Sequence, residues 1–252
     1  MNVSFLVSDD LIQPVREAIA PDDGMLVQGV PIEVARKHYF ETGRSALRCI
    51  RVALAAAGQS DIRKILDLPC GHGRVLRVLQ AAYPEAELHA CDLLAAGMEF
   101  CRSQLGAVAI SSDANPKKIR LKGPYDLIWV GSLFTHFDGP RWVPFLESLH
   151  AALAPGGVCV FTAHGNGAAQ VIRNGSTGYG LNDPGQLLGA FDRDGFSYAS
   201  YDGTSEYGIS LSSVSWVANQ IGRIPNARLV TVLERGWAEH QDVYAFQRVD
   251  WR

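Results

Sequence analysis

Three aspartates and a pair of glycines have the spacing of a small-molecule binding site. The stretch ILDLPCGHG places Asp67 at the end of an apolar run and follows it with a turn that contains Gly71 and Gly73. Asp92 ends the next such run, HACDL, and Asp113 follows the third. Glycines let a backbone approach a ligand closely. Acids at successive strand ends would gather at one edge of a parallel sheet, where such folds bind their ligands.

The glycine turn does not fit either of two phosphate-binding motifs. A P-loop needs Gly-Lys-Ser/Thr, and no such triplet follows this turn. In a dinucleotide fingerprint, Leu76 would replace the third glycine and hold the helix away from the strand. A carboxylate at Asp67 would also repel a pyrophosphate. The remaining interpretations are a ligand of another kind, or a turn that only packs.

A cationic nucleoside suits these residues better. S-adenosylmethionine carries a sulfonium and an ammonium, which an acid at a strand end would attract. Asp92 would accept hydrogen bonds from both ribose hydroxyls, as a carboxylate does at this place in dinucleotide folds. Asp113 would accept a hydrogen bond from the exocyclic amine of adenine. The ordered acids and glycines therefore predict S-adenosylmethionine as the cofactor.

Around these residues, apolar runs alternate with amphipathic segments. Strands are expected at 63–68, 87–93, 107–111, 125–132 and 158–164, with two closing strands at 228–235 and 242–249. Helices are expected at 74–83, 94–106, 141–153 and 210–224, and a PGG turn at 155–157. Strands separated by helical segments indicate parallel strands with crossover helices, and hence a doubly wound α/β sheet.

The N-terminal part lies outside this alternation. Residues 1–59 are expected to form a helical cap, with a short helix over 8–20. A longer helical stretch runs from Pro31 to Gly58, which suit a first turn and a stop. Gly43 is expected to divide that stretch into two helices.

The rest of the chain, residues 60–252, is expected to form the cofactor-binding domain. Within it, residues 165–210 interrupt the alternation and are rich in Gly, Asn, Asp and Tyr. Connections of this length are usually functional or disordered. We expect a lid-like insertion over the ligand face, and the alternative is a loop without fixed structure.

Together these motifs resemble those of the class I S-adenosylmethionine-dependent methyltransferases. The family's glycine motif is similar to LDLPCGHG, its ribose motif to HACDL and its third motif to SSDA. YDLIWVGSLFTHF is similar to the fourth motif, and ALAPGGVCVFTAH to the strand that follows. The resemblance covers residues 60–164 and implies a Rossmann-like seven-stranded sheet with an antiparallel final strand. Pro69 departs from the pattern and is expected to stiffen the turn without changing its ligand.

The resemblance also implies which residues hold the cofactor. They are Asp67, Cys70, Gly71 and Gly73 around the aminoacyl part, Asp92 at the ribose, Leu93, Asp113 and Ala114 at adenine, and Gly131 and Ser132 near the sulfonium. Arg44 would pair with the cofactor carboxylate, or else is a solvated helix arginine. Tyr39 lies in the same helical region and is expected to contact the substrate at the methionine end.

Two histidines at strand ends are candidates for a general base. Methyl transfer is an in-line displacement, so the protein mainly aligns the reactants and excludes water. A base helps when the acceptor is a hydroxyl or a protonated amine, and histidine suits that role near neutral pH. His136 follows the fourth strand and His164 ends the fifth, while His240 is a weaker candidate. In the insertion, Tyr201 and Tyr207 are expected to contact the substrate, or only to anchor the lid.

Composition limits the class of protein. The chain has 252 residues, 47% of them apolar, and a net charge of -3, so it can bury a large core and lacks a basic footprint for nucleic acid. Five cysteines without paired spacing indicate neither a disulfide framework nor a zinc site, which fits a cytoplasmic setting. No apolar stretch approaches the roughly 20 residues that cross a bilayer. We expect no metal and no membrane partner, and leave a homodimer open.

The leading functional prediction is an enzyme that methylates oxygen or nitrogen of a small molecule, sugar or lipid precursor. The alternative is a cofactor-binding or scaffold protein of the same fold that has lost catalysis. Aminopropyl transfer would need an acid-rich amine site, which the sequence does not show.

Overall fold

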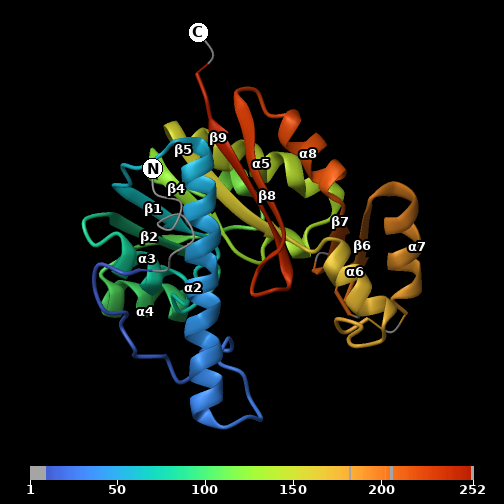
Figure 1. Ribbon diagram of the computed structural model, residues 1–252, viewed down its shortest axis with the longest axis horizontal. Coiled ribbons are helices and arrows are strands. Elements are labelled where there is room, and N and C mark those ends of the chain that lie inside the picture. Colours follow the sequence, from blue (N-terminus) through green and yellow to red (C-terminus); the bar gives the residue numbers. More distant parts are fainter. Residues whose placement is uncertain (1–9, 182, 202, 205–206, 251–252) are drawn as a thin grey trace.

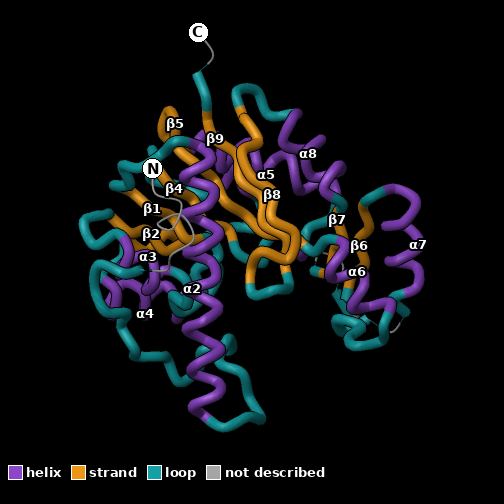
Figure 2. The backbone as a smooth tube through the Cα atoms, viewed as in Figure 1, coloured by secondary structure: helices purple, strands orange, loops and turns teal. Residues whose placement is uncertain are grey.

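A seven-stranded sheet forms the centre of the structure (Figures 1 and 2). This computed structural model describes residues 10–181, 183–201, 203–204 and 207–250. The strands of the sheet are β1 (Lys64–Asp67), β2 (Glu87–Asp92), β3 (Val108–Ser111), β4 (Tyr125–Val130), β5 (Leu153–Ala163), β8 (Ala227–Trp237) and β9 (Gln241–Arg248). Their order is β3-β2-β1-β4-β5-β9-β8. The first five strands pair in parallel, and β9 is antiparallel to both β5 and β8.

Helices cover both faces of this sheet. They are α2 (Ile32–Ala57), α3 (Leu76–Ala82) and α4 (Ala95–Leu105) on one face, and α5 (Gly139–Ala152) and α8 (Val214–Gly222) on the other. Successive side chains of a strand point to opposite faces. In β4, Leu127 and Trp129 therefore join the first core, and Ile128 and Val130 join the second. The predicted Rossmann-like, doubly wound sheet with an antiparallel final strand is confirmed.

Helix α2 runs through Gly43 without a break, so the expectation of two helices is wrong. A Cβ at Gly43 would lie 2.7 Å from the carbonyl oxygen of Arg74 and 2.8 Å from Cγ2 of Val78. The glycine therefore allows α2 to pack closely against the start of α3. The helix ends at Gly58, whose φ of 72° is left-handed, as the sequence predicts.

The helix predicted over 8–20 is also wrong for its described part, since residues 10–20 form no helix. The side chain of Arg77 donates hydrogen bonds to the carbonyl oxygens of Arg16 and Ala18. The backbone N–H groups of residues 12 and 13 donate to the carbonyl oxygen of Ala81, both at 3.0 Å. Because these backbone groups bind to α3 and its side chains, the segment stays extended and lies against that helix.

The insertion after β5 forms a separate group of helices and strands (Figure 1) and has a small core of its own. Its elements are α6 (Asn166–Arg173), α7 (Gly185–Asp194) and a hairpin of β6 (Phe196–Ser200) and β7 (Gly208–Ser212). Ile172 and Leu187 on the helices pack with Ile209 and Leu211 on β7. A loop without fixed structure is thereby excluded for the described residues of the segment.

Two boundaries differ from the sequence expectation. β5 begins at Leu153 and includes the PGG residues that were expected to form a separate turn, with an irregular register against β4 at its start. The helix expected from residue 210 begins only at Val214, because residues 208–212 pair with β6. Ser213 caps this helix by accepting a hydrogen bond from the backbone N–H of Trp216.

Candidate functional site

A cavity of about 480 Å³ lies at the carboxyl ends of strands β1 to β4. The predicted site residues on its wall are Asp67, Cys70, Gly71, Asp92, Leu93, Asp113, Ala114, Gly131, Ser132, His136 and Tyr207. These residues come from four strand ends and from the insertion, so the fold gathers most of the predicted site. The predicted residues that do not line this cavity are Tyr39, Arg44, Gly73, His164 and Tyr201.

The glycine turn after β1 is held by backbone hydrogen bonds. The N–H of Cys70 donates to the carbonyl oxygen of Cys91 (3.0 Å), and the N–H of Gly71 donates to Oδ2 of Asp92 (2.7 Å). Gly71 has a left-handed φ of 50°, and a Cβ there would meet no atom within 4 Å. The turn therefore presents bare backbone to the cavity, as a closely bound ligand requires.

Gly73 has a different task from the one predicted. Its φ is 77°, and a Cβ there would lie 2.7 Å from Cδ1 of Leu105 and 3.0 Å from Sγ of Cys101. The residue thus lets α4 pack against the turn and does not line the cavity. Gly97 of α4 does the same from the other side, since its Cβ would lie 2.4 Å from the carbonyl oxygen of Gly71.

Asp67 is the most deeply buried acid on the cavity wall. Its side chain is almost fully buried, and Oδ2 has no hydrogen-bond partner among the described residues. Burial, with a smaller effect from the charge of Asp92, holds the pKa of the Asp67 carboxyl well above its usual range. A buried carboxylate oxygen without a donor costs free energy, so a positively charged ligand group is the natural partner of Asp67.

Asp92 and Asp113 are engaged by backbone N–H groups. Besides the bond from Gly71, Asp92 accepts one from the N–H of Leu94 (2.9 Å). Asp113 accepts one from the N–H of Asn115 (2.8 Å). Each carboxylate oxygen keeps a second lone pair, so both side chains can still accept hydrogen bonds from a ligand in the cavity.

Gly131 and Ser132, which follow β4, form the floor of the cavity. A Cβ at Gly131 would lie 2.9 Å from Nε1 of Trp129, so only glycine fits there. Ser132 has a left-handed φ of 57°, a strained conformation that needs support from its surroundings. Its N–H donates to Oγ1 of Thr162 (2.8 Å), and its Oγ accepts from Nε2 of Gln241 (2.9 Å). These bonds hold Ser132 in place at the cavity.

His136 has a defined tautomer at the cavity wall. Its Nδ1 lies 2.7 Å from the carbonyl oxygen of Gly208, which can only accept, so Nδ1 carries the proton. Nε2 is then an acceptor, and the hydroxyl of Tyr207 lies 3.4 Å from it. Burial lowers the pKa of the His136 imidazole. His136 is therefore neutral near pH 7 and has a lone pair on Nε2.

His164 lies behind the cavity wall. Its ring is 5% exposed and contacts the rings of Tyr179 (4.9 Å between centroids) and His240 (5.4 Å). Burial, with smaller effects from the charges of His240 and His136, lowers the pKa of His164 to about 3. The structure does not bring this predicted base to the cofactor cavity.

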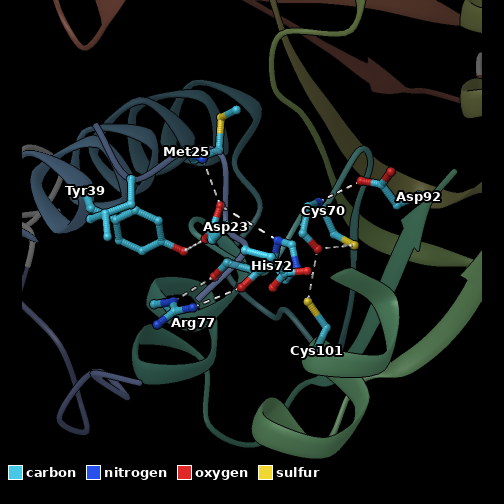
Figure 3. Close-up of polar contacts among 12 residues, drawn as sticks. Asp23, Met25, Tyr39, Cys70, His72, Arg77, Asp92 and Cys101 are labelled. Carbon is cyan, nitrogen blue, oxygen red and sulfur yellow. Dashed lines mark hydrogen bonds and ion pairs between the residues drawn. The ribbon is translucent and has the colours of Figure 1, made fainter. Parts of the chain in front are cut away.

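Tyr39 is part of a buried network (Figure 3). Its hydroxyl donates to Oδ2 of Asp23 (2.7 Å), and Asp23 accepts a second bond from the backbone N–H of Met25 (2.9 Å). The side chain of Arg77 lies 5.2 Å from the centre of the Tyr39 ring. Met25 lines the cofactor cavity. Tyr39 is therefore linked to the cavity wall through Asp23 and Met25 but does not itself line the cavity where it was predicted to contact the substrate.

Arg74, and not the predicted Arg44, lies on the wall of the cavity. Arg44 is not on the wall of the described cavity, whereas Arg74 lines it and lies 5.6 Å from the centre of the Trp237 ring. The Arg74 guanidinium forms no hydrogen bond or ion pair with the described residues, and burial lowers its pKa. The sequence signal was an arginine directly after the glycine turn.

The fold and the cavity together define an α/β protein with a ligand-sized cavity at its strand ends. Comparison with known proteins indicates which kind of domain this is. Residues 66–159 match the family model described as a methyltransferase domain. A curated relative, a malonyl-[acyl-carrier protein] O-methyltransferase from Priestia megaterium, is 25% identical over 111 residues. That match spans 44% of this chain and 40% of the relative.

Solved structures share the whole fold. DesVI from Streptomyces venezuelae has a TM-score of 0.56 and 14% identity, over 82% of this chain and 92% of its own. The N-methyltransferase NodS from Bradyrhizobium japonicum, solved in complex with S-adenosyl-L-homocysteine, has a TM-score of 0.52 and 15% identity, over 92% and 94%. Residues 66–159 of the chain thus form a methyltransferase domain, and these matches bear out the predicted resemblance to the class I S-adenosylmethionine-dependent methyltransferases and the predicted cofactor.

Among the described residues, no group of three or more His, Cys, Asp or Glu side chains is placed to hold a metal ion. None of the described helices has both the length and the apolar composition of a membrane-spanning segment.

Proposed function

We propose that the protein transfers the methyl group of S-adenosylmethionine to a small-molecule acceptor. The observation that carries this proposal is the strand-end cavity with Asp67, Asp92 and Asp113 on its wall. The unpartnered Oδ2 of Asp67 fits this cofactor, because an ammonium group would supply the donor that the buried oxygen lacks. A dinucleotide would instead bring a pyrophosphate toward that carboxylate.

The chain's own residues divide the binding of the cofactor among them. Asp67 and the bare backbone at Gly71 take the amino-acid end, and Arg74 replaces Arg44 as the partner of its carboxylate. Asp92 takes the ribose hydroxyls. Leu93 and Ala114 cover the adenine, and Asp113 accepts from its exocyclic amine. All of these residues except Arg44 line the cavity.

His136 is the better placed of the two predicted bases. When bound, the cofactor supplies a methyl group on positively charged sulfur, and transfer yields a methylated acceptor, S-adenosylhomocysteine and a proton. The lone pair on Nε2 of His136 would accept that proton at the cavity wall. Tyr207, stacked on the same ring, shields the imidazole from water. His164 is left with a structural role under the insertion.

The relatives do not decide which atom is methylated. One is named for O-methylation and another for N-methylation, and each name describes that protein alone.

Two measurements test the proposed function. S-adenosylhomocysteine should raise the melting temperature, since a ligand at 100 times its Kd adds roughly 2.7 kcal/mol to the free energy of unfolding. NAD serves as the control and should give no shift; a larger shift with NAD would contradict the cofactor. The protein should also move a ¹³C-methyl group from labelled S-adenosylmethionine into a small-molecule extract of the source cells, and no labelled product would contradict the activity.

A further inference from the structure

A second cavity, of about 290 Å³, adjoins the cofactor cavity. Arg74, Ser132 and Trp237 line both of them. Ser132 follows β4, near the place where the sequence resemblance puts the sulfonium. A molecule in the second cavity would therefore reach the cofactor cavity past Ser132.

The remaining wall of the second cavity comes from two elements on either side. His38 belongs to α2, and Ala238, His240 and Gln241 belong to the turn between β8 and β9 and the start of β9. His38 and Ala238 are exposed, so the cavity opens to solvent between α2 and this turn. A small molecule can enter there without passing through the cofactor cavity.

A fixed hydroxyl lies where the two cavities meet. Nε2 of Gln241 donates to Oγ of Ser132 (2.9 Å), while Oε1 of Gln241 accepts from Oγ1 of Thr162 (2.6 Å). Ser132 therefore uses its oxygen as an acceptor within the protein, and its hydroxyl proton remains for a ligand. The Ser132 hydroxyl would donate to an oxygen atom of a ligand and orient it.

The insertion fixes the opposite wall. The hydroxyl of Tyr179 lies 3.0 Å from Nε2 of His240, and the two rings are stacked at 5.8 Å. Tyr179 itself has a left-handed φ of 51°, a strained conformation. The contact orders His240 at the second cavity only when the insertion is docked.

The charges around the second cavity exclude one class of ligand. No Asp or Glu side chain lines it among the described residues, and its one permanent charge is the guanidinium of Arg74. Burial and the charge of Arg235 lower the pKa of His240, so this ring is neutral near pH 7. With the cofactor bound, the proposed pairing of Arg74 with its carboxylate leaves no unpaired charge on this wall. A protonated amine would therefore find no counterion, whereas the hydroxyls of a neutral molecule would find hydrogen-bond partners.

We infer that the second cavity binds the methyl acceptor, and that the acceptor is a small, neutral hydroxylated molecule that is methylated on oxygen. This inference rests on the proposed function and deepens it. The reacting hydroxyl lies at Ser132, and the remainder of the acceptor packs on Trp237 between His38 and His240. The new bond joins the hydroxyl oxygen to the methyl carbon while the bond from that carbon to the cofactor's sulfur breaks. The sulfur keeps the electron pair and leaves as S-adenosylhomocysteine, and the hydroxyl proton goes to Nε2 of His136.

Two substitutions that block the second cavity from opposite sides test this inference. His38→Trp places a large ring in it from α2, and Ala238→Trp does so from the β8–β9 turn. Lys37→Trp is the matched control, because Lys37 is an exposed neighbour on α2 that does not line the cavity. Calorimetry measures the binding of S-adenosylhomocysteine and of 5′-methylthioadenosine, which lacks the amino-acid end. Transfer is measured as ¹³C-methyl label in the small-molecule extract.

We expect both blocking variants to bind the two nucleosides as the wild type does, and to lose about tenfold or more of the transfer rate. Lys37→Trp should keep both properties. The carbon chemical shift of the transferred methyl should be that of a methyl attached to oxygen.

Three outcomes overturn the inference. Weakened binding of S-adenosylhomocysteine with unchanged binding of 5′-methylthioadenosine would place the cofactor's own amino-acid end in the second cavity. Undiminished transfer by both blocking variants would place the acceptor elsewhere. Label attached to nitrogen would refute the substrate class. A wild type that binds the nucleosides and labels nothing would instead contradict the proposed function itself.

Discussion

The ring of Tyr207 stacks on the ring of His136, with centroids 4.7 Å apart and planes inclined by 28°. Tyr207 comes from the insertion and His136 from the short 3₁₀ turn after β4, so the contact joins the insertion to the strand ends. It also covers the imidazole whose Nε2 faces the cavity. The environment of the candidate base therefore depends on the docked insertion.

The first prediction follows from that contact. Burial lowers the pKa of His136, so removing its cover in Tyr207→Ala should raise this pKa toward the ordinary value of about 6.5. Transfer requires the neutral base, so its rate falls as the pH drops through this pKa, and in the variant the fall should begin at a higher pH. Titration of the imidazole by NMR measures the pKa directly.

Tyr207→Phe is the control for this change. It keeps the stacked ring and removes only the hydroxyl that lies 3.4 Å from Nε2. Its titration should resemble that of the wild type. An unchanged pKa in Tyr207→Ala would show that the insertion does not shield His136.

A second prediction concerns His164 and stability in acid. Its pKa is lowered by burial to about 3 in the folded protein, against about 6.5 in the unfolded chain. Between these pH values the unfolded chain binds a proton that the folded protein does not, so stability is full above about pH 6.5 and falls as the pH falls toward 3. His164→Asn should therefore flatten the decline of melting temperature with acid.

The same change at exposed His38 gives the comparison. His38→Asn removes a histidine from the surface and should leave the acid decline of the wild type in place. Transfer of the methyl group by His164→Asn should persist at pH 7, because His164 does not line the cofactor cavity. A loss of transfer on the order of 10²–10⁴, with the fold intact, would restore His164 as a base.

The sequence predicted the parts of the site that depend on strand ends. Asp67 and Asp92 each close an apolar run, and a parallel sheet must bring such ends together. The sequence could not show that Arg74, and not Arg44, lines the cavity, because the position of each arginine depends on how α2 crosses α3. The extended segment before α2 was missed for a similar reason: its backbone groups bind Arg77 and Ala81, which are remote in sequence.

The fold of the insertion could not be predicted from the sequence for a different reason. Its hairpin and helices are short, and their apolar residues show no sustained period, so its fold was not predicted. His164 and His136 both follow strand ends, so the sequence alone could not show which of them lies at the cavity. The insertion decides between them, since it covers His164 with Tyr179 and leaves His136 at the cavity.

A third prediction concerns Asp92, which supports both the turn and the cofactor. Asp92→Ala removes the acceptor for the N–H groups of Gly71 and Leu94, and also the charged acceptor proposed for the ribose. A hydrogen bond to a charged group contributes roughly 1.5–3 kcal/mol, so affinity for S-adenosylhomocysteine should fall about tenfold to a hundredfold. Calorimetry on the folded variant measures this loss.

Asp113→Ala is the matched comparison for Asp92→Ala. Asp113 also lines the cavity, but its backbone bond to Asn115 is local and does not hold the glycine turn. The loss of affinity should therefore be smaller than at Asp92. Equal affinity of Asp92→Ala and the wild type would refute the assignment of the ribose to Asp92.

The last prediction tests the packing of α2, which carries one wall of the second cavity. A Cβ at Gly43 would lie 2.7 Å from the carbonyl oxygen of Arg74, a backbone atom that cannot turn away. Overpacking of this kind costs about 1–3 kcal/mol, so Gly43→Ala should lower the melting temperature by several degrees. It should also weaken binding of S-adenosylhomocysteine, because the strain falls on Arg74, the residue proposed to bind its carboxylate.

Gly189→Ala is the control, since Gly189 is inside α7 and a Cβ there meets no atom within 4 Å. Alanine is favoured over glycine in a helix by about 0.5–1 kcal/mol, so this variant should melt slightly higher than the wild type and bind the nucleoside unchanged. If Gly43→Ala behaved like Gly189→Ala in both measurements, α2 would not be packed on the glycine turn as described, and the shared wall at Arg74 would lose its support.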